Sequence, residues 1–333
     1  DQAIDASYGG RADEALQWFD EALKADPEGA EAHNGRGEIL WDGGRIDEAL
    51  YAFEQSIAVD SKFVTAHLNR SELLIEDLGE YVRAMALCDE LLAGHQHLPR
   101  VERAVELELY YLKAKAFYYQ GDLSGSLFLI RKALKVGGEV ALYRVFEGQA
   151  LFESAEFQEA RQVLERALML DPDSAHAGYY LGLTLEHLGE DVAAAQAFEE
   201  ADALDPDHYP RPTSFGAACF RKALKDAIED LPKSLARHLK ELSLVTEPLP
   251  EASTMRQEDV SPQTLGLFDG APRREVPEAP ADSRNKIVLF KRNFEKIARN
   301  EEELSEQLTL VLKSELGHYL GLDDTTLEGL GLL

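Results

Sequence analysis

Apolar residues in positions 1–206 recur at the i, i+3, i+4 spacing of amphipathic helices, and the same arrangement returns along the chain. Each unit has a small residue, with an apolar residue four positions later. The small residues are Ala15, Ala49, Ala84, Ser126, Ala160 and Ala194, which are separated by 34, 35, 42, 34 and 34 residues. A nearly fixed period of this length predicts a solenoid of stacked helix pairs.

The boundaries of the helices are marked as well. The second helix of a unit follows a glycine and a polar or acidic stretch, as at 44–48, 121–124 and 189–191. Proline follows it at Pro27, Pro172 and Pro206, where it ends the helix. This pattern resembles the tetratricopeptide repeat. The resemblance implies a mainly α protein whose α-solenoid holds another polypeptide.

The period also predicts the domains. We expect about six repeats, the first of them incomplete, and a longer loop around 94–100, where the 42-residue step has eight extra residues. The period stops after residue 206. The predicted domains are therefore a solenoid at 1–206, a proline-rich connector at 207–212 and a second domain at 213–333.

The resemblance places the first helices on the concave face and their second, fifth, sixth, ninth, twelfth and thirteenth residues in the groove. The early units then contribute Glu31, Glu38, Trp41, Glu72 and Glu76. The later units contribute Tyr111, Tyr118, Tyr119, Phe146, Phe152, Tyr179 and Tyr180. We expect a groove that is acidic at one end and aromatic at the other. The alternative for any one tyrosine is packing between neighbouring helices.

Charge narrows the class of partner. Residues 1–205 contain 40 acidic and 17 basic side chains, whereas residues 206–333 contain 22 and 17, and the whole chain has a net charge of −28. A field of this sign repels nucleic acid and anionic membrane and favours a protein or peptide with basic and apolar or aromatic residues. The fifth positions are Asn34, Leu68, Tyr111, Val145 and Tyr179. In the family that this chain resembles, repeats that bind chaperone carboxylate tails have lysine, arginine and asparagine at and around this position. Because none of the five residues is basic, we expect no such binding.

The second domain combines helices and strands. Helices are predicted at 215–230, 232–241 and 301–320, and strands at 242–246, 264–268 and 287–290. Six prolines within 247–285 predict a stretch that is mostly loop and partly disordered. The result is a small α+β domain.

The last predicted helix contains Ser314, Glu315, His318, Gly321 and Asp324 at the spacing of the H-E-x-x-H-x-x-G-x-x-D motif. It resembles the small bacterial zincin-like metallopeptidase family, whose members also have segments like 261–270 and 287–293. The resemblance implies that Glu315 is the catalytic base and that His318 and Asp324 are ligands of zinc. The first histidine of the motif is replaced by Ser314, and a serine hydroxyl is a poor zinc ligand.

Three functions remain open. The first is a scaffold with a degenerate zincin-like domain, a pseudopeptidase used for binding or regulation, with no cofactor as the sequence stands. The second is an active zinc metallopeptidase to which the repeats recruit substrate; Ser314 is then an introduced change, or a residue such as His208 or His238 completes the site. The third is a structural cap on the last repeat.

The two cysteines, Cys88 and Cys219, lie among apolar residues in predicted helices, so we expect reduced thiols and a cytoplasmic protein. The chain begins at Asp1 and not at Met, so we expect the native N-terminus to be absent. A signal peptide that has been removed is compatible with this start. No apolar run reaches the roughly 18 residues of a membrane helix.

Overall fold

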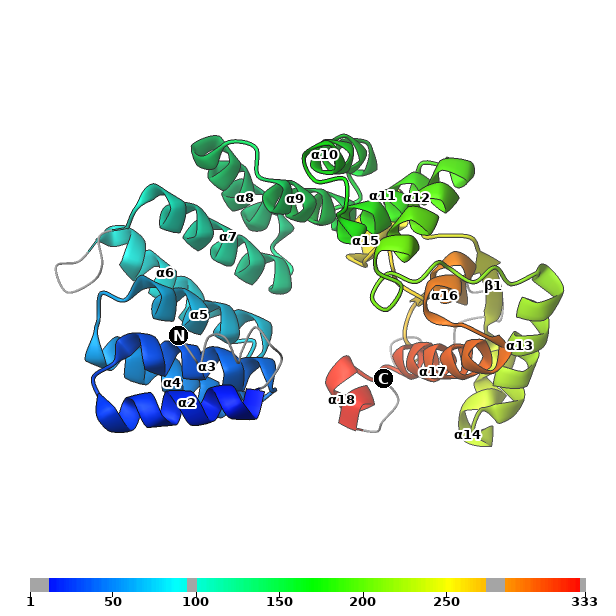
Figure 1. Cartoon of the computed structure of the whole chain (residues 1–333). Helices are drawn as coiled ribbons and strands as arrows, with labels where there is room; N and C mark the ends of the chain where they lie inside the picture. The colour runs from blue at the N-terminus through cyan, green and yellow to red at the C-terminus, as the bar shows by residue number, and fades with distance from the viewer. Residues whose placement is uncertain (1–11, 95–100, 274–284, 330–333) are drawn as a thin grey trace. The chain divides into compact units, whose positions relative to one another are not determined.

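The computed structural model describes residues 12–94, 101–273 and 285–329 (Figure 1). The chain forms two compact units: residues 1–151 with 169–171, and residues 152–168 with 172–333. The predicted boundary at 206–213 therefore lies inside the second unit, because the last repeats pack with the C-terminal domain.

The first unit consists of successive helices in pairs, as the period predicts. They are α2 (Ala12–Ala25), α3 (Ala30–Asp42), α4 (Ile46–Val59), α5 (Val64–Glu76), α6 (Tyr81–Ala93), α7 (Arg103–Tyr119), α8 (Leu123–Gly137) and most of α9 (Ala141–Glu153). The repeated small residues Ala15, Ala49, Ala84 and Ser126 are fully buried. Gly37 serves the same close packing, since a Cβ there would lie 2.6 Å from the Phe53 ring.

Part of the extra length in the 42-residue step between the third and fourth repeats lies in helix α7. The first helices α3, α5 and α9 have 13 residues each, whereas α7 has 17. The predicted long loop overlaps residues 95–100, which lie outside the described part of the chain. The eight extra residues thus lengthen α7 by about one turn.

The second unit begins with the last repeats and ends with an α+β domain. The repeat helices are α10 (Phe157–Leu170), α11 (Ala175–His187) and α12 (Asp191–Leu204). Then follow α13 (Ala217–Asp230), α14 (Lys233–Ala236), a 3₁₀ helix (Arg237–Glu241), β1 (Ser243–Glu247), α15 (Ala252–Glu258), β2 (Gly266–Asp269), β3 (Lys286–Phe290), α16 (Lys291–Ile297), α17 (Glu301–Tyr319) and α18 (Asp324–Gly329).

The sheet has the order β1-β3-β2, with β1 parallel and β2 antiparallel to β3. Its central strand is buried, and Ile287 and Leu289 contribute to a core with α13 and α17. Leu304, Leu308, Leu312 and Leu316 recur on one face of α17 and are fully buried. Three motif residues, Ser314, Glu315 and His318, are therefore held by a helix that is anchored along most of its length.

Within the stretch 247–285, which was predicted to be mostly loop, one short segment is helical. Helix α15 lies inside it, between Pro250 and Pro262, and its C-cap residue Asp259 is in the left-handed region with φ 53°. Prolines are compatible with positions before and after a helix, so they delimit α15 and do not break it. Residues 274–284 lie outside the described part of the chain.

Two further expectations concern cysteines and membranes. Cys88 is buried and Cys219 half-buried, and both are free thiols. Burial raises the pKa of the Cys88 thiol to about 12, which makes it unreactive. Among the described helices, none has the length and apolar character that crossing a bilayer requires.

Candidate functional site

We call the side of the first helices α3, α5 and α7 that was predicted to line the groove the inner face. On α3 and α5, side-chain amides hold an acidic residue of this face in place. The side-chain amide of Asn34 donates to Glu38 Oε1 at 2.9 Å, and that of Asn69 donates to the same oxygen at 2.8 Å. Asn69 also donates to Asn34 Oδ1 at 3.1 Å, which links α3 to α5. The exposed Glu38 carboxylate is thus fixed in position. Glu31 lies about two turns before it on α3 and is also exposed.

Lys115, which was not among the predicted groove residues, pairs with two acidic residues that were. Lys115 Nζ lies 3.0 Å from Glu72 Oε1 and also pairs with Glu76. Burial alone lowers the pKa of Lys115, but the bond to Glu76 and the charges of Glu72 and Glu76 outweigh it and raise the pKa. Lys115 occupies the ninth position of its unit, as Glu38 and Glu72 do, so its position in the repeat could have identified it.

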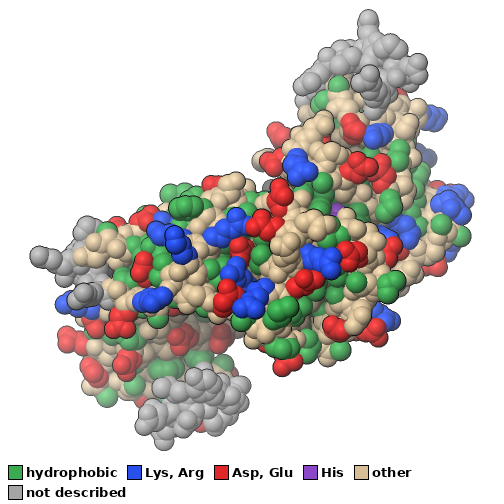
Figure 2. All heavy atoms as spheres, turned by 90° about the horizontal axis from the view of Figure 1, so that it is seen from above, with side chains coloured by type: hydrophobic (Ala, Val, Ile, Leu, Met, Phe, Trp, Pro, Cys, Tyr) green, Lys and Arg blue, Asp and Glu red, His purple; other side chains and the backbone are tan. Residues whose placement is uncertain are grey.

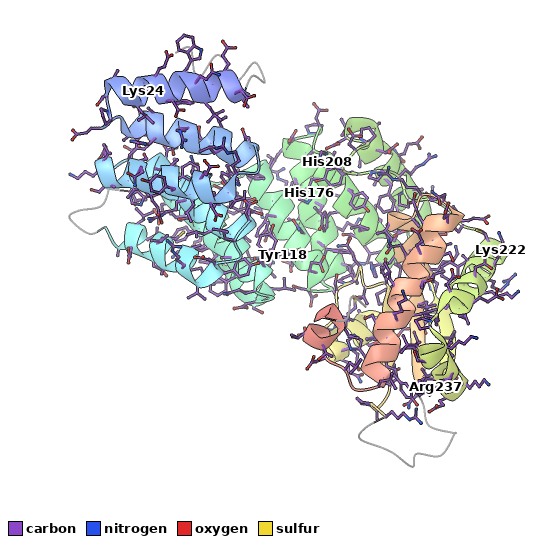
Figure 3. All side chains as sticks on the ribbon, turned by 90° about the horizontal axis from the view of Figure 1, so that it is seen from below. Lys24, Tyr118, His176, His208, Lys222 and Arg237 are labelled. Carbon is purple, nitrogen blue, oxygen red and sulfur yellow. The ribbon has the colours of Figure 1, made fainter. Side chains whose placement is uncertain are left out.

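Aromatic side chains follow on α7 and α9, within the first unit. The Tyr111 ring packs 5.3 Å from that of Phe146, and the Tyr118 ring 5.5 Å from it. The Tyr118 hydroxyl accepts a bond from the Gln149 amide at 3.0 Å (Figure 3 labels Tyr118). Phe146 is 7% exposed. It therefore supports the tyrosines and offers little surface to a partner.

Two aromatic residues extend the polar part of the face. The Tyr119 hydroxyl donates to Glu76 Oε2 at 3.0 Å, and its ring stacks 6.0 Å from that of Tyr81. Tyr119 is 47% exposed and so remains available to a partner. The Trp41 indole donates to Asp77 Oδ2 at 2.6 Å.

The last repeats differ from the prediction. Phe152 is fully buried, with its ring packed against those of Phe157, Tyr180 and His187. The structure therefore does not offer Phe152 to a partner, because it forms the core between neighbouring helices. Tyr179 and Tyr180 are half-buried, and Tyr179 packs against Phe198 and Tyr209.

The C-terminal domain itself contacts the groove positions of these repeats. Glu153, the thirteenth residue of its unit, accepts bonds from Ser261 Oγ at 2.7 Å and from the Gln263 side-chain amide at 3.0 Å. Burial raises the pKa of Glu153, and these two bonds oppose the effect. The segment between α15 and β2 therefore occupies a position that the sequence analysis assigned to the groove.

Helix α16 makes a second contact of this kind. Lys296 Nζ lies 2.6 Å from Glu186 Oε2, and Arg292 Nη1 lies 2.7 Å from Asp191 Oδ1 and 3.7 Å from Glu186 Oε1. The side-chain amide of Asn293 donates to the carbonyl oxygens of Pro262 and Thr264 at 2.9 and 2.7 Å. This amide joins α16 to the segment that contacts Glu153.

A cavity of about 960 Å³ lies beside this junction, between α12, residues 211–214, the end of β1 and α16. Most charged groups on its wall pair with one another. Lys291 bonds to Glu295, Arg292 to Asp191, and the backbone N–H of Phe215 donates to Glu295. The cavity thus belongs to the contact between the last repeats and the C-terminal domain.

On the motif helix α17, Ser314 Oγ lies 3.4 Å from His318 Nε2. The backbone N–H of Phe268 on β2 donates to Glu315 Oε2 at 2.7 Å. Ser314 and Glu315 are 8% and 9% exposed. Asp324 is the first residue of α18, but its side chain lies outside the described part of the structure.

The described donors do not fit a zinc site. They offer one imidazole beside a serine hydroxyl, and the Glu315 carboxylate already accepts a bond from the edge of the sheet. No group of three His, Cys, Asp or Glu residues that could hold a metal occurs among the described side chains. Zinc in proteins takes three or four nitrogen, sulfur or carboxylate ligands.

Neither candidate rescue ligand completes the set. His238 is buried, and its ring nitrogens contact Glu241, Arg273 and Arg237 at 3.2, 2.8 and 3.1 Å. His208 is exposed and contacts Asp205 at 3.0 Å. Figure 3 labels His208 beside the last repeats.

Two known protein families match the chain, one in the repeats and one in the C-terminal domain. The family described as tetratricopeptide repeat matches residues 1–62, 40–99, 111–168 and 147–209, which together exceed half of the chain. The family described as zincin-like metallopeptidase matches residues 239–332. No curated protein matches the chain.

Solved structures of low sequence identity share the repeat fold. PilW, described as a widely conserved type IV pilus biogenesis factor, is 17% identical with TM-score 0.54, covering 62% of this chain and 91% of that one. For pilF of Pseudomonas aeruginosa the values are 18%, 0.50, 62% and 89%. For the Cut9–Hcn1 hetero-tetramer of APC/C they are 17%, 0.52, 62% and 39%.

Proposed function

Because this chain belongs to the tetratricopeptide-repeat family and has a zincin-like domain, we propose that it is a polypeptide-binding scaffold whose zincin-like domain is degenerate. The scaffold would hold a partner on the inner face of α3, α5 and α7. The zincin-like domain would serve as a binding or regulatory module, a pseudopeptidase.

The inner face of the first unit supports a partner that combines basic and aromatic or apolar residues. Glu38 is fixed by two amides, and Glu72 and Glu76 already attract a cation, Lys115. Tyr119 beside them is exposed. A basic side chain of the partner would compete with Lys115 for the two carboxylates, and the tyrosine would supply apolar contact area.

The observation that carries the degenerate assignment is the pairing of Ser314 with His318 on α17. At 3.4 Å, Ser314 Oγ lies one helical turn from the imidazole, where the motif has its first histidine. Two protein ligands at most would then come from His318 and Asp324, and such a pair binds zinc weakly. Glu315 would have a structural role through Phe268.

The test compares the unmodified protein with Ser314→His. We expect no stoichiometric zinc and no peptidase activity in the unmodified protein. If the rest of the motif has the family's geometry, Ser314→His should bind zinc one-to-one, as measured by metal content after dialysis and by titration against a chelator. Ser305→His, elsewhere on the same helix, is the matched control and should bind no zinc.

Two outcomes would decide against the proposal. Tight one-to-one zinc in the unmodified protein, lost in His318→Ala, would show that another group completes the site. The active metallopeptidase, with substrate recruited by the repeats, would then be the better assignment. Hydrolysis of a peptide library by the unmodified protein would lead to the same conclusion.

A further inference from the structure

The second helices of the repeats carry acidic residues at one recurring position, except in the fourth repeat. Counted five residues after the small residue, the position holds Asp20, Glu54, Asp89, Arg131, Glu165 and Glu199. The next position holds Glu21, Gln55, Glu90, Lys132, Arg166 and Glu200. Helix α8 has no acidic residue at all and also contains Lys135. The charge of this surface is therefore reversed on one helix of an acidic chain.

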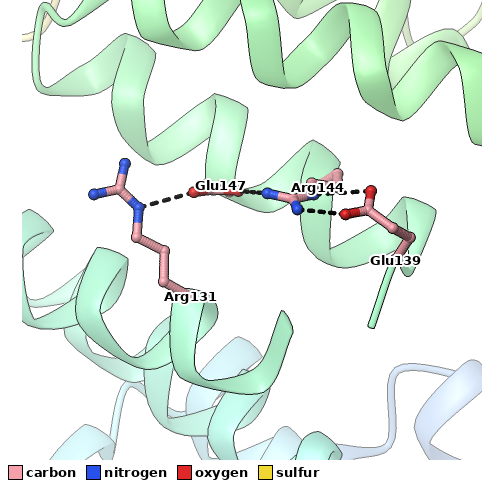
Figure 4. Close-up of polar contacts among 4 residues, drawn as sticks. All are labelled: Arg131, Glu139, Arg144 and Glu147. Carbon is pink, nitrogen blue, oxygen red and sulfur yellow. Dashed lines mark hydrogen bonds and ion pairs between the residues drawn. The ribbon is translucent and has the colours of Figure 1, made fainter. Parts of the chain in front are cut away.

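Neighbouring side chains hold two of the three cations of α8 in place. Arg131 Nε donates to Glu147 Oε1 at 2.8 Å, and the Glu147 side chain is only 4% exposed. Arg144 bridges the other oxygen of Glu147 to Glu139, and the terminal nitrogens of Arg131 point away from Glu147 (Figure 4). Lys132 Nζ lies 4.2 Å from the centre of the Tyr110 ring. Cations that are already positioned lose less entropy when they bind.

An exposed aromatic ring lies among these cations. Phe128 is 68% exposed, and with Leu127, Ser124 and the three cations it lines a surface hollow of about 650 Å³. Figure 2 shows one face of the molecule on which Lys and Arg side chains lie beside hydrophobic ones. A single exposed phenylalanine is ordinary, but one beside a hollow and fixed cations has the composition of a recognition site.

We propose that the outer face of α8 is a second interaction surface, which binds an acidic polypeptide segment through Arg131, Lys132 and Lys135 and takes one bulky apolar side chain of that segment beside Phe128. This surface is separate from the inner face, where a basic partner is proposed. The two faces would let the scaffold hold two chemically different polypeptides.

The charge of the whole chain decides which anion is favoured. The screening length at physiological salt is about 8 Å, so a short segment on α8 responds mainly to the local cations. An anionic membrane is an extended surface and would also meet the acidic helices α4 and α6 of the same unit. The net charge of −28 therefore favours a short polypeptide over a lipid surface.

The test uses the full chain and a labelled, capped peptide Glu-Glu-Phe-Glu-Glu, with binding followed by fluorescence anisotropy and by NMR shifts of α8. Lys132→Glu combined with Lys135→Glu should weaken binding about tenfold or more, and Phe128→Ala about fivefold, since rim charges and a small hydrophobic contact are each worth roughly 1 kcal/mol. Arg131 is left unchanged, because its removal would take away one of the two guanidinium groups that pair with the buried Glu147 carboxylate.

The matched control is Tyr51→Ala. Tyr51 holds the same repeat position on α4 as Phe128 does on α8 and is 60% exposed, but α4 has Glu54 and Gln55 where α8 has Arg131 and Lys132. It should leave binding unchanged, and all variants should keep the helical circular dichroism of the parent protein.

Three results would overturn the proposal. They are equal binding of Lys-Lys-Phe-Lys-Lys at α8, failure of the acidic peptide to bind at millimolar concentration, and binding that the α8 variants do not alter. Phosphatidylserine vesicles form the other arm. If they bind the protein with the same dependence on Lys132, Lys135 and Phe128 while the peptide does not, the ligand is a membrane and the polypeptide assignment is wrong.

Discussion

Lys296 Nζ on α16 lies 2.6 Å from Glu186 Oε2 on α11, and the two side chains are only 5% and 11% exposed. The pair joins the zincin-like domain to the last complete repeat. Burial lowers the pKa of Lys296, and the charge of Glu186 opposes this shift. Each charge therefore depends on the other for its place in the interior.

Removal of one partner should destabilise the second unit strongly. Glu186→Ala leaves a buried ammonium without its carboxylate and should lower the free energy of unfolding by about 3–5 kcal/mol, measured by urea denaturation. The double change Glu186→Leu with Lys296→Met should recover most of the loss. Lys225→Ala breaks the exposed pair with Glu229 and should cost less than about 1 kcal/mol. A loss as small in Glu186→Ala as in this control would contradict a buried role for the pair.

His187 should make the second unit sensitive to acid. Burial first, and then the charges of Lys296 and Arg292, lower its pKa to about 3 from an ordinary 6.5. Between these values the unfolded chain binds a proton that the folded chain does not. The free energy of unfolding should therefore fall as pH drops below 6.5, with a limiting slope of about 1.4 kcal/mol per pH unit from this group.

The measurement is urea unfolding between pH 7 and 5, above the range where most carboxylates titrate. His187→Phe keeps a ring that can stack on Phe157 and should flatten the slope in this window. His208→Gln is the control, because Asp205 raises the pKa of the exposed His208. A raised pKa means that the folded chain binds this proton more tightly than the unfolded chain, so His208 stabilises the protein at low pH and less as pH rises. Its removal should therefore not flatten the fall of the free energy of unfolding with acid. An unchanged slope in His187→Phe would refute the assignment.

Lys115 should act as an internal competitor on the inner face. Lys115→Met releases Glu72 and Glu76, so a labelled, capped peptide Lys-Trp-Lys-Trp-Lys should bind roughly 5–10-fold more tightly at low salt. The gain should shrink at 0.5 M salt, where surface charges are screened. Lys113→Met, which removes the pair with Asp89 from the same helix, should leave affinity unchanged. Weaker binding in Lys115→Met would mean that Lys115 contacts the partner itself.

Glu315 should contribute to stability through β2. Glu315→Ala removes the acceptor for the Phe268 N–H and should lower the free energy of unfolding by about 1–3 kcal/mol, whereas Glu315→Gln retains an acceptor and should cost less than about 1 kcal/mol. Thermal and urea unfolding of both variants provide the measurement. Equal losses in the two variants would indicate that the carboxylate charge, and not the bond to β2, matters.

The repeats could be predicted from the sequence because their signals are local. Ala49, Ala84 and Ala160 are fully buried, as their spacing requires, and the strands at 242–246, 264–268 and 287–290 correspond to β1, β2 and β3. Short helices were harder to predict. Residues 252–258 form α15 in a stretch whose prolines favour loop, and α16 follows β3 without a loop, so no turn signal separates that helix from the strand.

The contact between the domains could not be predicted from local patterns. Glu153, Glu186 and His187 hold groove positions of the repeat, yet their partners Ser261, Gln263, Lys296 and Arg292 lie about one hundred residues further along the chain. Periodicity shows which face a residue lies on, but not what covers that face. The burial of Phe152 is a similar case, since its ring neighbours lie on α10 and α11, beyond the end of its own helix.

The contact of Ser261 and Gln263 with Glu153 limits the length of the peptide segment that the proposed inner face could bind. With the later positions in contact with the chain's own domain, exposed inner side chains come mainly from α3, α5 and α7, which pack in that order. Neighbouring helices lie about 8–10 Å apart, and an extended chain advances about 3.3 Å per residue. The two intervals between these three helices span roughly 16–20 Å, which an extended segment of about five or six residues covers. A face of this size suits a short linear motif in an otherwise unstructured region better than the surface of a folded domain.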